Sequence, residues 1–228
     1  MEIFKFEDRE VASVAAAEAL VAALSRRLDL QARASMIITG GSSPARCYQE
    51  MSAAPIDWHR VDLVLSDERW IPADHDDSNE KQARETLLVD TAENANLVGV
   101  YRDDEDLENR VDSLDAELKL LPIPFACSLL GMGADGHFAS LFPDAANLDD
   151  GLDKQRAHFC LAVDTAASPH RRLSLSLSAI ARSDVILLLI FGDDKLDVIN
   201  AAIDGSSDYP VESLLRQKQA PVHVYWAP

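Results

Sequence analysis

The stretch Ser128-Leu-Leu-Gly-Met-Gly-Ala-Asp-Gly-His-Phe-Ala-Ser-Leu-Phe-Pro143 decides how the rest of this chain is interpreted. The apolar run 125–130 predicts a buried strand, and three glycines follow it within six residues. Glycine lets the backbone take a positive φ and approach a ligand closely. A strand that ends in such a loop places an acid and a histidine at the carboxyl edge of a sheet, where open α/β sheets bind ligands. We therefore take His137 as the chemical centre of the protein.

The composition favours one acidic domain that spans residues 1–228. With 228 residues, 47% of them hydrophobic, the chain can build the core of a single α/β domain. A formal net charge of −18 argues against nucleic acid or an anionic membrane as a partner, but a local cluster of Arg and Lys can still bind a small anion. Neither a signal peptide nor an apolar stretch of ~18 residues is visible. We expect a cytoplasmic protein, monomeric or homodimeric, with a small molecule as its substrate.

Apolar segments and turn signals alternate along the whole chain. Strands are expected at 3–6, 35–39, 61–65, 97–101, 125–130, 158–163, 173–177, 185–191 and 222–226, and helices at 9–30, 44–51, 79–88, 104–120 and from about 195 to 203. Ser43 is the expected N-cap of the second helix. Serines that alternate with Leu173 and Leu175 indicate a half-buried strand, and 144–156 reads as a surface loop. The alternation predicts a three-layer α/β/α fold, with a mostly parallel, Rossmann-like sheet flanked by helices on both faces.

Four loops are expected at one edge of this sheet, because parallel strands joined by crossovers end on the same side. They begin at Gly40, Ser66, Gly131 and Gly192. The loops and their neighbours supply the candidate ligand-binding residues, which are Gly40, Gly41, Ser42, Asp67, Arg69, Gly131, Gly133, Arg172 and Lys195.

Each of these candidates also has an ordinary structural explanation. The backbone amides of Gly40 and Gly41, with Ser42, suit a phosphate at a helix N-terminus, or they simply begin a capped helix. Arg69 can bind a phosphate or carboxylate with Asp67 or Glu68 as its orienting acid, or form a surface ion pair. The cations at 172 and 195 favour anion capture in so acidic a chain, although solvated surface charge explains either one alone.

The glycine loop itself permits three interpretations. Its spacing, Gly131-x-Gly-x-x-Gly136, matches the dinucleotide fingerprint, but that fingerprint lies in the first βα turn and needs an acid about 20 residues on. His137 would also occupy the place of the pyrophosphate. A cradle of backbone amides for an anion and a tight turn with a surface histidine remain open. Asp135 beside His137 can orient or charge the imidazole, as general acid–base chemistry requires.

Other common chemistries lack their motifs. The chain has no Gly-x-Ser-x-Gly elbow for a serine triad and no phosphate-binding Gly-x4-Gly-Lys-Ser/Thr loop. Cys47, Cys127 and Cys160 show neither a disulfide framework nor metal spacing, and the five remaining histidines show no ligand spacing either. We expect no metal and no cofactor, and a small phosphorylated ligand with one histidine as the acid–base group.

The chain resembles the 6-phosphogluconolactonase family over nearly its whole length. The most specific piece is Gly131-Met-Gly-Ala-Asp-Gly-His-Phe-Ala-Ser-Leu-Phe-Pro143. In family order, the supporting pieces are Gly40-Gly-Ser-Ser-Pro44, Asp67-Glu-Arg-Trp70 with Ser78-Asn79, Arg172-Leu-Ser-Leu175 and Gly192-Asp-Asp-Lys195. The resemblance implies hydrolysis of 6-phospho-D-glucono-1,5-lactone to 6-phosphogluconate, the second step of the oxidative pentose phosphate pathway. For this reaction we expect His137 as general base and Asp135 as its orienting acid, with Ser42, Arg172 and Lys195 as candidates for the phosphate and Arg69 for either end of the ligand.

Two rival functions stay open at this point. Glucosamine-6-phosphate deaminases and isomerases share the fold that the resemblance implies, but their corresponding loop carries a catalytic glutamate five residues after the histidine. Here that position is Phe142, which favours ester hydrolysis. A non-catalytic sugar-phosphate sensor is the second rival, and it would be expected to carry a basic DNA-binding segment that is not visible here.

Overall fold

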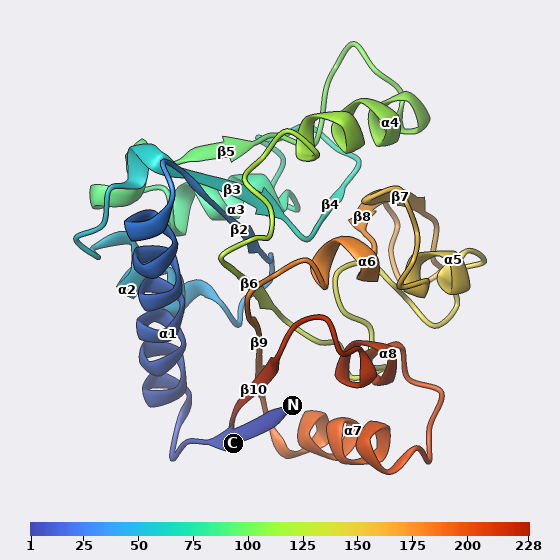
Figure 1. Ribbon diagram of the computed structural model, residues 1–228. Coiled ribbons are helices and arrows are strands. Elements are labelled where there is room, and N and C mark those ends of the chain that lie inside the picture. Colours follow the sequence, from blue (N-terminus) through green and yellow to red (C-terminus); the bar gives the residue numbers. More distant parts are fainter.

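A parallel sheet of seven strands runs through the molecule in the order β1-β10-β9-β6-β2-β3-β5. The computed structural model describes all residues 1–228 (Figure 1). The strands of this sheet are β1 (Glu2–Lys5), β2 (Ala34–Ile38), β3 (Val61–Leu65), β5 (Asn96–Val98), β6 (Cys127–Leu130), β9 (Ile186–Phe191) and β10 (Val222–Ala227). Every pairing between neighbours is parallel. The central strands are buried on both faces, as near-continuous apolar runs predict.

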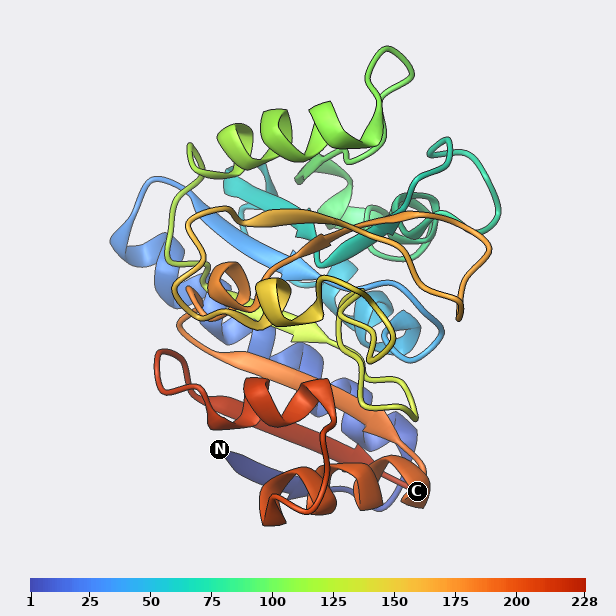
Figure 2. The ribbon, with the colours of Figure 1, turned by 90° about the vertical axis from the view of Figure 1, so that its right-hand side faces the viewer.

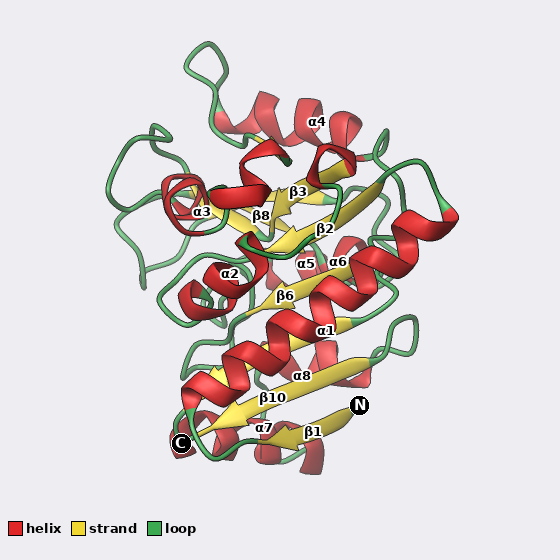
Figure 3. Ribbon diagram, turned by 90° about the vertical axis from the view of Figure 1, so that its left-hand side faces the viewer, coloured by secondary structure: helices red, strands yellow, loops and turns green.

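Helices cover both faces of this sheet, so the predicted three-layer architecture is confirmed (Figures 1 and 3). The helices are α1 (Arg9–Leu30), α2 (Ala45–Ser52), α3 (Asn79–Thr86), α4 (Leu107–Leu118), α5 (Leu148–Leu152), α6 (Leu177–Ile180), α7 (Asp193–Asp204) and α8 (Pro210–Arg216). Helix α1 crosses one face, with α2 beside it, while α7 and α8 pack on the other. The buried stripe of α1 includes Ala12, Ala16 and Ala17, and these small residues let the helix lie close to the sheet.

A second, smaller sheet was not expected. Strands β4 (Asp67–Arg69), β8 (Arg172–Leu175) and β7 (Cys160–Val163) pair antiparallel, and this sheet lies beside α4 (Figure 2). The prediction that the strand around Leu173 is half-buried is wrong, because Leu173, Ser174 and Leu175 are all buried. Ser174 tolerates burial because its hydroxyl accepts a hydrogen bond from the amide of Ser140 and donates one to the carbonyl of Leu175. The pairing sets Arg69 directly opposite Arg172.

Some local predictions are also wrong. Ser43 does not cap α2: Pro44 occupies the N-cap position, already in a helical conformation, and no side chain caps the helix. The segment 144–156 contains the short helix α5 rather than only a loop. Helices α6 and α8 were not predicted, because so few residues show no clear periodicity, although Pro210 in the first turn of α8 is a typical start signal.

The four expected loops do lie together. They follow β2, β3, β6 and β9, which are neighbours in the sheet and parallel, so their carboxyl ends share one edge. All three cysteines are buried as free thiols in the core. No helix combines the length and the apolar character that crossing a membrane requires.

Candidate active site

A cavity of about 580 Å³ opens at this edge of the sheet. It brings together all eleven residues singled out from the sequence, namely Gly40, Gly41, Ser42, Asp67, Arg69, Gly131, Gly133, Asp135, His137, Arg172 and Lys195. Further lining residues include Asn79, Ala139, Phe142 and Ala167. Ala167 belongs to the β7–β8 connection, and the sequence held no signal for it because only the fold brings this connection to the cavity.

His137 and Asp135 form a dyad at the mouth of the glycine loop. The imidazole Nδ1 lies 2.5 Å from Oδ1 of Asp135, and the imidazole remains 27% exposed, so it can meet a ligand. An ionised carboxylate only accepts hydrogen bonds, so Nδ1 carries the proton in the neutral ring and Nε2 keeps a free lone pair. This tautomer is the one that a general base needs.

The glycines of this loop shape the turn. The amide of Gly133 donates to the carbonyl of His137 at 2.9 Å, and the amide of Gly136 donates to the carbonyl of Gly133 at 3.1 Å. Gly136 has φ +76°, and an added Cβ would lie 2.7 Å from Cβ of Tyr209, so both backbone and space require glycine there. The loop therefore turns sharply enough for His137 to reach back over Gly133.

The loop after β2 is anchored from two sides. The buried hydroxyl of Tyr48 donates to the carbonyl of Thr39 at 2.6 Å and accepts from its amide at 2.9 Å. Gln82 brackets Gly41, accepting from its amide at 2.8 Å and donating to its carbonyl. The Gly41 amide is therefore engaged in this conformation and not free for a phosphate. Gly40 has no room for a side chain, since its Cβ would lie 1.9 Å from Oδ1 of Asn79.

Arg172 and Arg69 are the two arginines that line the cavity. Nη1 of Arg172 lies 3.4 Å from Oδ2 of Asp67, and Nη2 lies 3.2 Å from Oγ of Ser168. Burial lowers the pKa of Arg172, and the Asp67 carboxylate opposes that shift. The Nε groups of both arginines are buried and have no hydrogen-bond partner. Both side chains therefore have hydrogen-bonding capacity left for an anion.

The prediction that Asp67 or Glu68 orients the Arg69 guanidinium is wrong. Asp67 pairs with Arg172 instead, and Arg69 donates through Nη1 to the carbonyl of Asp77. The Glu68 side chain points to the opposite face of β4 from Asp67 and Arg69, because neighbouring side chains alternate along a strand. Its buried carboxylate accepts from Ser78 Oγ and from the backbone amides of residues 69, 79 and 80 at 2.7–2.9 Å. Burial raises the pKa of Glu68, and these hydrogen bonds oppose the shift.

Lys195 lies in the first turn of α7, which follows β9, and lines the same cavity as the two arginines. Burial lowers the pKa of its ammonium group, the nearby Asp194 opposes that shift, and Arg9 adds to it. Lys195 and Ser42 also line a neighbouring cavity of about 490 Å³. The three cations gather around one cavity on a chain of net charge −18, which indicates selection for an anionic ligand.

This arrangement agrees with the chain's similarity to known proteins. Residues 7–226 match the family model described as glucosamine-6-phosphate isomerases/6-phosphogluconolactonase. The chain belongs to this family. It is 38% identical to the 6-phosphogluconolactonase of Pseudomonas aeruginosa over 200 residues, which cover 87% of this chain and 83% of that relative. It is 33% identical to the 6-phosphogluconolactonase of Pseudomonas putida over 230 residues, which cover 100% and 93%.

Solved structures of the family have the same fold. The crystal structure of a 6-phosphogluconolactonase from Shewanella baltica OS155 superposes with a TM-score of 0.94 at 35% identity and covers 100% of this chain and 98% of that one. A monomeric glucosamine-6-phosphate deaminase superposes with a TM-score of 0.72 at 17% identity and covers 98% and 97%. At that identity the deaminase shares the fold alone.

Proposed function

We propose that this protein is a 6-phosphogluconolactonase that hydrolyses 6-phospho-D-glucono-1,5-lactone to 6-phospho-D-gluconate. The observation that carries the proposal is the His137–Asp135 dyad in a cavity with Arg69, Arg172 and Lys195, in a chain whose relatives bear that name. The dyad supplies a base for water, and the cations match a phosphorylated substrate. The reaction is the second step of the oxidative pentose phosphate pathway.

His137 acts as the general base in this mechanism. Nε2 takes a proton from a water molecule while the water oxygen bonds to C1 of the lactone, which gives a tetrahedral intermediate and an imidazolium. The bond between C1 and the ring oxygen then breaks, and the imidazolium returns its proton to that oxygen. Asp135 holds Nδ1–H throughout and stabilises the imidazolium that forms between the two steps.

Different groups bind the lactone end and the phosphate end of the substrate. The amide of Gly133 is already bonded to the carbonyl of His137, whereas the amides of Ala134 and Asp135 make no hydrogen bond within the protein. These two amides, with Arg69, are our candidates for the developing oxyanion. Ser42, Arg172 and Lys195 hold the 6-phosphate, where a guanidinium supplies paired donors and an ammonium supplies a point charge.

The proposed function is tested by following the decay of freshly generated 6-phosphogluconolactone with and without the protein. We expect decay well above the spontaneous rate. Release of ammonia from glucosamine 6-phosphate would instead assign the deaminase reaction. Binding of the lactone or of 6-phosphogluconate without any acceleration would assign a sensor.

Phosphate binding through Lys195 predicts a specific pH dependence. The protonated ammonium attracts the phosphate dianion, and because burial lowers its pKa, Lys195 loses its proton at a lower pH than an ordinary lysine. Affinity for 6-phosphogluconate should therefore be full at neutral pH and fall as the pH rises through this lowered pKa. Calorimetric titration between pH 7 and about 10 measures it.

Two variants separate this effect from general alkaline changes. Lys195→Arg keeps the charge over the whole range and should remove the alkaline loss of affinity. Lys218→Arg, at an exposed position outside both cavities, should leave the wild-type profile unchanged. An identical alkaline loss in Lys195→Arg would exclude Lys195 from the phosphate site.

A further inference from the structure

The segment that follows His137 forms a tight turn against the cavity. The amide of Leu141 donates to the carbonyl of Phe138 at 3.1 Å and closes the turn. Ala139 lies inside the turn and has φ +49°. This is the left-handed region, which residues other than glycine disfavour. Such a conformation persists only where the surroundings hold it in place. The contacts of Ser140 and Phe142 show what holds this turn.

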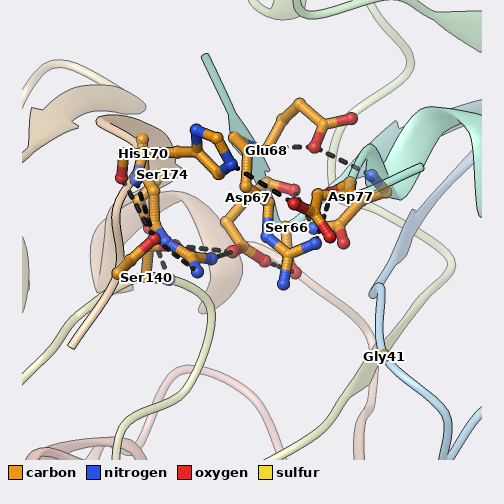
Figure 4. A network of polar contacts seen from close by, with 12 residues as sticks. Gly41, Ser66, Asp67, Glu68, Asp77, Ser140, His170 and Ser174 are labelled. Atoms are coloured by element: carbon orange, nitrogen blue, oxygen red, sulfur yellow. Dashed lines mark hydrogen bonds and ion pairs between the residues drawn. The ribbon is translucent and has the colours of Figure 1, made fainter. Parts of the chain in front are cut away.

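Ser140 joins the turn to strands β4 and β8 through hydrogen bonds. Its fully buried hydroxyl donates to Oδ2 of Asp67 at 2.5 Å, and its amide donates to Oγ of Ser174 at 3.1 Å (Figure 4). Asp67 lies on β4 and Ser174 on β8, the strand that also carries Arg172. Nη1 of Arg172 lies 3.4 Å from both the Asp67 carboxylate and the Ser140 hydroxyl. Asp67 and Ser140 therefore support the guanidinium together.

Phe142 connects the same turn to the base. Its ring centroid lies 4.1 Å from that of the His137 imidazole, with an angle of 32° between the planes. The guanidinium carbon of Arg172 lies 5.3 Å from the same phenyl centroid, within the range of a cation–π interaction. The phenyl ring is only 4% exposed, so its position is fixed by packing.

We propose that Ser140 and Phe142 are positioning residues that hold the His137 imidazole and the Arg172 guanidinium in one fixed arrangement. This inference rests on the proposed function and deepens it. Neither residue supplies a proton or a charge to the reaction; they act through the two groups that do. The base and the anion-binding cation then approach the substrate as a single preformed unit, which is how orientation contributes to catalysis.

The test compares Phe142→Leu with Phe159→Leu. Phe159 is a similarly buried phenylalanine with Arg182 at 5.0 Å and Lys119 at 5.6 Å from its ring centroid, but it does not line the cavity. Both variants lose a buried ring and its cation–π contacts, so Phe159→Leu should lower Tm at least as much as Phe142→Leu does. We expect Phe142→Leu to lower kcat at least about tenfold, Phe142→Tyr to recover most of it, and Phe159→Leu to stay near wild type.

A double-mutant cycle shows whether Phe142 acts through Arg172. If it does, Phe142→Leu should lower kcat/KM by a smaller factor in an Arg172→Ala background than in the wild type. A merely structural role would give the same factor in both backgrounds and would overturn the proposal. Ser140→Ala should raise KM more than it lowers kcat, because the guanidinium loses support while the dyad stays intact.

A spectroscopic readout keeps this inference separable from the proposed reaction. In ¹⁵N-labelled protein, the imidazole Nδ1–H bonded to Asp135 should give a strongly downfield proton signal. Phe142→Leu should broaden or shift that signal, and Phe159→Leu should leave it in place. If the two variants differ in this way but the wild type does not hydrolyse the lactone, the proposed function fails and the positioning role stands. If the wild type hydrolyses the lactone and both variants behave alike, the positioning role is wrong.

Discussion

Replacing His137 by Asn should lower kcat for 6-phosphogluconolactone hydrolysis by about 10²- to 10⁴-fold, the range for loss of a general base. The Asn amide can still donate to Asp135, as Nδ1 of the imidazole does, but it has no basic nitrogen for the attacking water. The imidazole is partly exposed and outside the core, so the variant should fold normally. Initial rates corrected for spontaneous hydrolysis, with 6-phosphogluconate binding measured in parallel, separate lost chemistry from lost binding.

His59→Asn is the matched control for this experiment. His59 is exposed and lies outside the cavity, so its replacement should change neither kcat nor KM. The general-base mechanism would be wrong if His137→Asn hydrolysed the lactone at close to the wild-type rate. A variant that lost affinity for 6-phosphogluconate but kept kcat would instead make His137 a binding residue.

Gly133→Ala should lower kcat about 10²-fold, because the new methyl group would enter the dyad. A Cβ built on Gly133 lies 2.3 Å from both Cε1 and Nδ1 of His137 and 2.5 Å from Oδ1 of Asp135. No such separation is tolerated, so the imidazole and the carboxylate must move apart. A misplacement of about 1 Å can cost two orders of magnitude in rate. Both side chains can rotate toward solvent, so the loss of stability should be small compared with the loss of activity.

Gly131→Ala is the matched control for Gly133→Ala. A Cβ built on Gly131 meets no atom within 4 Å, and neither glycine has a positive φ, so the two substitutions have the same backbone requirements. Gly131→Ala should keep kcat within a few-fold of the wild type. Steady-state kinetics and thermal melts of the pair decide the question. Equal activity in the two variants would mean that contact with Gly133 does not control the dyad.

Local signals in the sequence predicted the parts of the fold that depend on near neighbours. The bounds of α1 were predicted at 9–30 because this Ala-rich stretch keeps one periodic apolar stripe, and the structure adds Asp8 as its N-cap, with Oδ1 accepting from the amide of Val11. The residues of β3 were predicted at 61–65 because they form a short apolar run between turn signals. The meeting of four loops followed from parallel topology, a rule that needs no distances.

Contacts between distant segments could not be predicted in this way. The pairing of β4 with β8 joins residues about a hundred positions apart, and no periodicity specifies which strand a three-residue segment such as 67–69 will join. Its register decided that Asp67 supports Arg172 rather than Arg69. The engagement of the Gly41 amide by Gln82 is a further contact that only packing could bring about.

The sequence by itself determined the class of fold, the family, and the types of residue that the cavity holds. Each of these depends on composition, periodicity and motif order, which are properties of the linear chain. The tertiary structure alone decided how those residues are connected: which acid faces which cation, which amides stay free, and how the turn at Ala139 joins His137 to Arg172. These connections depend on strand register and side-chain packing, which are set by the global minimum of free energy rather than by any local pattern.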